Sequence, residues 1–142
     1  MQLVLAAVAA ACAAATLLVA GALESEPTSR PDVVSPACRS RTNARACSVA
    51  LRYLAALDLD RAGEACVLLD RATLEAAGGM AGCTRTLLGA KGIRIRYSVL
   101  AVLRSPLGWT VSFSTAASGG RPLRQQMLVS RAGRIVAVVP EP

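Results

Sequence analysis

The stretch Ile93–Arg104, with the sequence IRIRYSVLAVLR, decides the fold. Its apolar side chains recur at every second position, which is the period of a β-strand with one buried face. The set expected to be buried is Ile93, Ile95, Tyr97, Val99, Ala101 and Leu103. Before Gly92 the apolar residues follow a helical period instead, so the chain changes from helices to strands at this point.

Three more strands are predicted downstream, separated by turns rich in glycine and proline. They are Trp109–Ser114, Leu123–Arg131 and Arg134–Val139. The dipeptide Ala132-Gly133 fits a tight hairpin turn between the last two strands. Because short connections join successive strands, we expect an antiparallel meander of four strands.

Three short helices are predicted upstream, from apolar residues spaced three and four positions apart. They are Ala46–Leu57, Arg61–Leu69 and Met80–Ala90, and the last should turn Met80, Cys83 or Thr84, Leu87 and Leu88 inward. Asp60 is expected to cap the second helix. A new segment should begin at Asp70 or Thr73, and Gly78-Gly79 should interrupt it before the third helix. Helices followed by strands indicate an α+β domain, with three short helices packed on a curved sheet.

The N-terminal stretch Leu3–Leu23 carries no charged residue. As a helix of about 30 Å it would be long enough to cross a bilayer. A signal peptide cut after Ala20-Gly21-Ala22, an uncleaved membrane anchor, and lipidation at Cys12 are the three interpretations that stay open. Each places the domain outside the cytoplasm, either secreted or anchored to the cell membrane.

The chain divides into a signal peptide or anchor at 1–23, a flexible linker at 24–44 and a folded domain at 45–142. Proline, serine and threonine fill the linker, and its apolar residues show no period. Charge is uneven: residues 76–142 contain nine basic side chains against one acid, whereas residues 24–75 are nearly neutral. A basic half favours an anionic surface, and well-solvated arginines without any partner are the simpler interpretation.

The order of three helices and a curved antiparallel meander resembles the cone-shaped fold of the nuclear transport factor two superfamily. The likeness is carried by Arg52–Asp58, Glu64–Leu69, Cys83, Gly108–Val111 and the final hairpin, and it covers residues 44–139. The chain looks most like small exported actinobacterial domains that follow one N-terminal hydrophobic segment. The resemblance implies a cone-like domain but no activity, because the superfamily includes isomerases, dehydratases, transport adaptors and secretion-system components.

Four cysteines follow the hydrophobic stretch, and an even number in an oxidising compartment favours two disulfides. Of the three pairings we favour Cys66–Cys83, which joins two helices, and Cys38–Cys47, which pins the linker to the first helix. Free buried thiols are the alternative. A zinc site is not expected, because the sequence has no CxxC pair and no histidine.

Catalytic side chains are scarce. Without histidine, Ser–His and Cys–His nucleophiles are excluded, and the acids of the folded part stand at helix starts or turns. We therefore assign no catalytic residue and expect no cofactor. Tyr97 and Gln125, each on an apolar strand face, are the candidate ligand contacts, and core packing is the alternative for Tyr97.

We expect a non-catalytic exported or membrane-anchored envelope domain that binds a partner protein or a small apolar ligand. The alternative is a small cone-fold enzyme of the isomerase or cyclase type, which a buried carboxylate beside Tyr97 or Gln125 would favour. The expected partners are the membrane, through residues 3–23 if they are uncleaved, and an envelope protein or an anionic surface. Nucleic acid is not expected, because the strands offer few aromatic side chains for base stacking.

Overall fold

The structure is a computed structural model that describes residues 35–89 and 92–142. The predictions made for the hydrophobic stretch Leu3–Leu23, and for the linker up to residue 34, fall outside the described residues. Within the described ranges, no helix combines the length and the hydrophobicity needed to span a bilayer.

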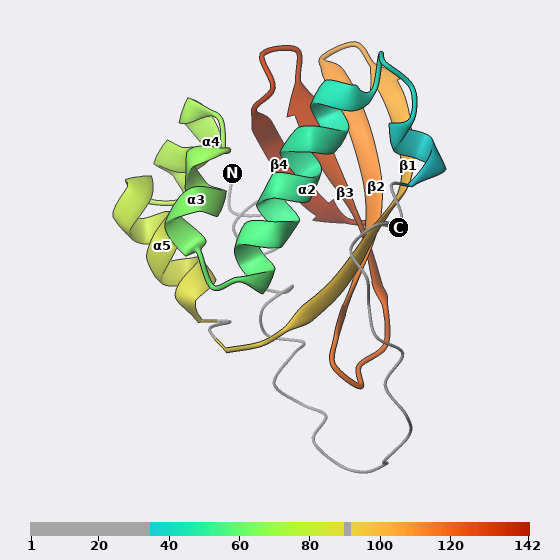
Figure 1. Cartoon of the computed structure of the whole chain (residues 1–142). Helices are drawn as coiled ribbons and strands as arrows, with labels where there is room; N and C mark the ends of the chain where they lie inside the picture. The colour runs from blue at the N-terminus through green and yellow to red at the C-terminus, as the bar shows by residue number, and fades with distance from the viewer. Residues whose placement is uncertain (1–34, 90–91) are drawn as a thin grey trace.

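Across the described residues, four α-helices pack on one face of a four-stranded antiparallel sheet (Figure 1). After one 3-10 turn, η2 (Pro36–Cys38), the helices are α2 (Ala44–Asp58), α3 (Ala62–Val67), α4 (Arg71–Ala76) and α5 (Gly79–Leu88). The strands lie in chain order as β1 (Ile95–Ser105), β2 (Gly108–Ala117), β3 (Leu123–Ser130) and β4 (Ile135–Pro140). The α+β class and the four-stranded meander are confirmed. Helix α4 was not predicted, because we expected only a new segment to begin at Asp70 or Thr73.

The long helix α2 crosses the sheet and supplies its main cover (Figure 1). Its buried stripe contains Ala46, Ala50, Tyr53 and Leu54, as expected, and the half-buried Leu57 extends it. Each large apolar side chain buried in this way stabilises the fold by about 1.5–3 kcal/mol. The largest fully buried side chains of the core are Leu54, Val111, Phe113, Met127, Val129 and Ile135.

Leu100 is an extra residue in β1, because Val99 and Ala101 pair with consecutive residues of β2. A β-bulge of this kind exchanges the two faces of the strand beyond it. Val102 therefore faces the helices, whereas Leu103 lies on the uncovered side and is 65% exposed. The prediction that Ala101 and Leu103 are buried with Val99 is wrong, because the five successive apolar residues Val99–Leu103 conceal the extra one.

Two predicted helix features also differ. Asp60 does not cap α3: its backbone is left-handed (φ 57°), and its Oδ1 accepts a hydrogen bond from the Gly92 N–H at 2.9 Å. In α5 the buried residues are Cys83 and Leu87, whereas Met80 and Leu88 are exposed. The break at Gly78-Gly79 is confirmed, because both glycines adopt positive φ where α4 gives way to α5.

The last part of the predicted linker, from Ser35 onward, is folded. It forms η2, which packs beside β1, and it leads into α2 at Ala44. The folded domain therefore begins before residue 45.

Candidate functional site

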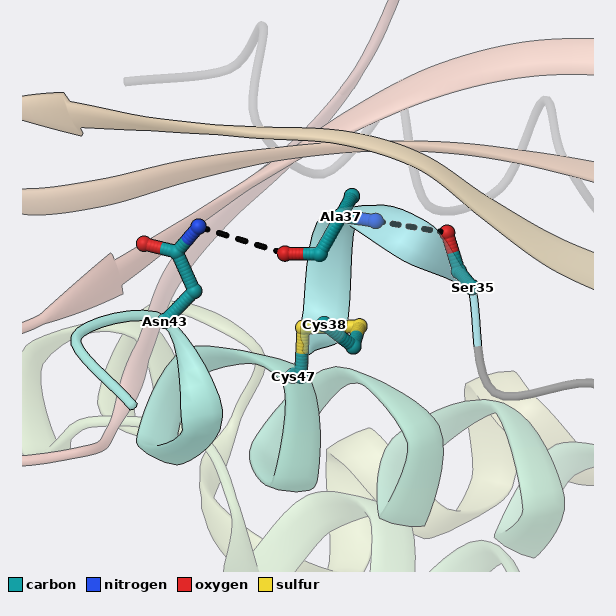
Figure 2. The surroundings of a disulfide bond; sticks show 5 residues. All are labelled: Ser35, Ala37, Cys38, Asn43 and Cys47. Atoms are coloured by element: carbon teal, nitrogen blue, oxygen red, sulfur yellow. Dashed lines mark hydrogen bonds between the residues drawn. A yellow bond between two sulfur atoms is a disulfide. The ribbon is translucent and has the colours of Figure 1, made fainter. Parts of the chain in front are cut away.

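Two disulfide bonds hold the helical layer, Cys38–Cys47 and Cys66–Cys83, which are the two pairs favoured from the sequence. The first ties η2 to α2 (Figure 2). Around it the Asn43 amide donates to the Ala37 carbonyl at 3.2 Å, so side-chain and covalent contacts both fix the approach to α2. Disulfides persist in oxidising compartments, and these two indicate an environment outside the cytoplasm.

An apolar pocket of about 40 Å³ lies between the helices and β4. Four elements build its wall: α2, α4, α5 and β4. The lining residues are Tyr53, Leu69, Thr73, Ala76, Ala77, Cys83, Thr86, Leu87, Ile135 and Val138. None of these side chains is a carboxylate, an amine, a guanidinium or an imidazole, so apart from the phenol of Tyr53 and two threonine hydroxyls the pocket presents a carbon-rich wall.

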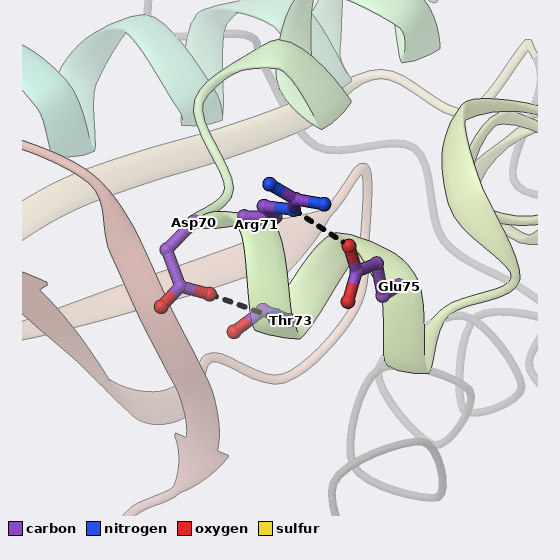
Figure 3. Close-up of polar contacts among 4 residues, drawn as sticks. All are labelled: Asp70, Arg71, Thr73 and Glu75. Atoms are coloured by element: carbon purple, nitrogen blue, oxygen red, sulfur yellow. Dashed lines mark hydrogen bonds and ion pairs between the residues drawn. The ribbon is translucent and has the colours of Figure 1, made fainter.

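The α4 side of the pocket is attached to β4 by several polar contacts. Asp70 caps the helix, its Oδ1 accepting the Thr73 N–H at 2.7 Å (Figure 3). The Asp70 N–H donates to the Ile135 carbonyl at 2.8 Å, and the Thr73 hydroxyl donates to the Val136 carbonyl at 2.7 Å. These bonds bring a six-residue helix, too short to be stable alone, into a fixed position against the sheet.

The hydroxyl protons of the two wall threonines are used by the main chain. Thr73 donates to β4, as above, and Thr86 donates to the Gly82 carbonyl at 3.0 Å within its own helix. Each bond satisfies a polar group that would otherwise be costly beside an apolar cavity. The wall is therefore suited to hydrocarbon and not to a polar ligand group.

The Cys66–Cys83 disulfide fixes the remaining side of the pocket. Cys66 lies in α3 and is fully buried, and Cys83 lies in α5 and lines the pocket. Because the bond joins two short helices, it restrains the wall that α5 contributes.

Tyr97 and Gln125 lie on the helix-covered face of the sheet but outside the pocket wall. Tyr97 pairs with Thr115 and Gln125 with Phe113, so β2 separates them and they stand in adjacent rows. Gln125 is buried, and no hydrogen bond of its amide group is found among residues 35–89 and 92–142. The structure does not bring the two side chains together, and their role as ligand contacts stays a prediction.

The carboxylate of Asp58, at the end of α2, acts on the phenol of Tyr97. Burial and then the Asp58 carboxylate raise the pKa of Tyr97 above its ordinary value. Asp58 itself accepts the Ile95 N–H at 2.9 Å and pairs with the Arg94 guanidinium at 3.2 Å. This carboxylate therefore ties α2 to the start of β1.

Sequence reasoning missed the α4 side of the pocket. Three of its ten lining residues, Thr73, Ala76 and Ala77, lie in α4 or in the turn after it, where no helix was expected. Thr73 was noticed only as a possible helix start, and no local signal distinguishes Thr86 from a surface threonine. Among the described residues there is no group of three potential metal ligands.

The sequence matches no model of a known protein family and no curated protein.

Proposed function

We propose that this chain is an exported, non-catalytic binding domain of cone-like fold. Its apolar pocket receives a short alkyl group, either from a small apolar molecule or from an aliphatic side chain of a partner protein. The observation that carries the proposal is the pocket wall, which four elements and one disulfide build from apolar side chains, the buried Tyr53 and two threonines bonded to the main chain.

The size of the pocket limits what enters it. About 40 Å³ is room for roughly three water molecules or a few methylene groups. A complete drug-sized ligand occupies a site of about 300–1,000 Å³. The pocket is therefore matched to the end of a ligand, and the rest of that ligand lies outside it.

Catalysis of the isomerase or cyclase type finds less support. Acid–base chemistry needs a titratable side chain in contact with the reacting atoms. Among the described residues the pocket wall offers no carboxylate, amine or imidazole, and its titratable group is the phenol of Tyr53, which is buried and already interacts with a partner. The carboxylate nearest to Tyr97, Asp58, is outside the wall and is already engaged by Ile95 and Arg94.

The proposal is tested by titrating the protein with a series of 1-alkanols and following its methyl resonances by NMR. Binding should saturate, and affinity should rise about fourfold for each added methylene, at about 0.8 kcal/mol per group, until the pocket is full. Beyond that length the affinity should stop rising.

Two alanine-to-leucine variants provide the test and its control. Both alanines are exposed, but only Ala76 lines the pocket, so Ala76→Leu should weaken binding at least tenfold, whereas Ala81→Leu adds the same bulk outside the wall. Binding that persists unchanged in Ala76→Leu, or shifts that grow linearly without saturation, would place the alkanols elsewhere.

A further inference from the structure

One end of the domain collects exposed leucines and arginines from segments far apart in the chain. The β1–β2 turn, the β3–β4 turn and the start of α2 lie together at this end (Figure 1). The Arg131 N–H donates to the Leu107 carbonyl at 3.3 Å, which joins the two turns directly. We call this surface the basic tip, and it consists of Arg45, Leu103, Arg104, Leu107, Arg131 and Arg134.

The arginines of the basic tip are bonded to the main chain. Arg45 donates to the Arg131 carbonyl at 3.1 Å, Arg131 donates to the Pro106 carbonyl at 3.3 Å, and Arg134 donates to the Val67 carbonyl. Arg104 stands over the Trp109 ring at 5.9 Å. Ion pairs among the described residues involve only arginines outside the tip, so its positive charge is not neutralised by a carboxylate there.

Apolar side chains project from the same end. Leu107 forms the tip of the β1–β2 turn, Leu103 lies on the face of β1 exposed by the bulge, and each is 65% exposed. These are the two most exposed large hydrophobic side chains of the described chain. Trp109 pairs with Arg104 at the same end, is partly buried, and lies on the helix-covered face of the sheet, opposite to Leu103.

We propose that the basic tip docks on the surface of an anionic lipid bilayer. Apolar side chains that enter the headgroup region, surrounded by cations that meet anionic lipids, are the pattern of peripheral membrane binding. An acidic protein or polymer would satisfy the arginines but gives no reason for the exposed Leu107 in the turn and the exposed Leu103 in β1. The surface is separate from the pocket, so the proposal does not depend on the alkyl-binding function.

Trp109 gives a specific signal, because it is the sole tryptophan of the chain. The full chain is added to vesicles of phosphatidylcholine alone, or of phosphatidylcholine with phosphatidylglycerol, that carry lipids brominated in their acyl chains. Quenching of Trp109 reports contact of the tip even if residues 3–23 hold the chain on every vesicle. We expect quenching on the anionic vesicles only, and its loss at high salt.

A double variant removes one cation and one apolar contact. Arg131→Gln with Leu107→Ser should lower the ratio of docked to undocked tips at least about fivefold, since each arginine near an anionic surface contributes about that factor. The matched control is Arg121→Gln with Leu123→Ser at the β2–β3 turn, where Leu123 is also exposed. The control should match the wild type, and circular dichroism should show that both variants are folded.

The proposal is overturned if Trp109 is quenched equally on neutral and anionic vesicles, or if the tip variant behaves as the wild type does. It is also overturned if vesicles give no quenching while soluble polyglutamate changes the Trp109 emission in a tip-dependent way. That result would assign the surface to an acidic polymer.

Discussion

Removing the Cys66–Cys83 bond should destabilise the domain strongly. The two cysteines are 17 residues apart. For a loop of that length the chain-entropy relation gives about 3 kcal/mol at 25 °C. Both side chains are buried, so the double replacement Cys66→Ala and Cys83→Ala also leaves small cavities, which cost about 1 kcal/mol more. The expected loss of about 4 kcal/mol is a large part of the 5–15 kcal/mol typical of a whole domain.

The matched comparison is Cys38→Ala with Cys47→Ala. Here the separation is only 9 residues, and Cys38 is merely half-buried. The same relation gives about 2.5 kcal/mol for this shorter loop. Guanidinium denaturation without reductant measures both losses against the wild type. Because Cys83 lines the pocket, only the first variant should also weaken alkanol binding.

The reasoning is refuted if loss of Cys66–Cys83 costs less than loss of Cys38–Cys47. It is refuted equally if the alkanol affinity falls by the same factor in both variants, because the position of α5 in the pocket wall would then not depend on the Cys66–Cys83 bond.

Two further predictions concern single side chains. Burial and Asp58 raise the pKa of Tyr97 in the folded protein above its ordinary value of about 10. The stabilisation linked to this phenol is therefore fully present below about pH 10 and is lost as the pH rises through the pKa of the folded state. Denaturation at increasing alkaline pH should show this decline in the wild type and a smaller one in Tyr97→Phe; identical profiles would contradict it. Asp70→Ala removes the α4 cap and should cost about 1 kcal/mol. Glu75→Ala, which removes only an exposed pair with Arg71, should cost at most about 0.5 kcal/mol, and equal losses in the same assay would contradict this assignment.

The sequence was sufficient for the elements whose periodicity is unbroken. The stripe of α2 and the alternation of β3 around Met127 each identify one buried face, and the change of period after Gly92 locates the boundary between helices and strands. Alternation fails in β1 because apolar residues run without interruption from Val99 to Leu103 and hide the bulge at Leu100.

The pocket was harder to predict than the fold. It depends on α4, whose six residues give too short a pattern to recognise and which is held by Asp70 and Thr73 through contacts to β4. Such contacts join residues more than sixty positions apart, as Thr73 to Val136 does, and no local sequence pattern contains them. Tyr97 and Gln125 attracted attention as polar groups on apolar faces, but the register places β2 between them.

A crystal of the protein pressurised with xenon tests the central claim most directly, because xenon enters dry apolar cavities. We predict a xenon atom in the pocket between Thr73, Leu87 and Val138, and no xenon at that position in Ala76→Leu. Ordered water in the pocket, or xenon bound only at other sites, would contradict the account.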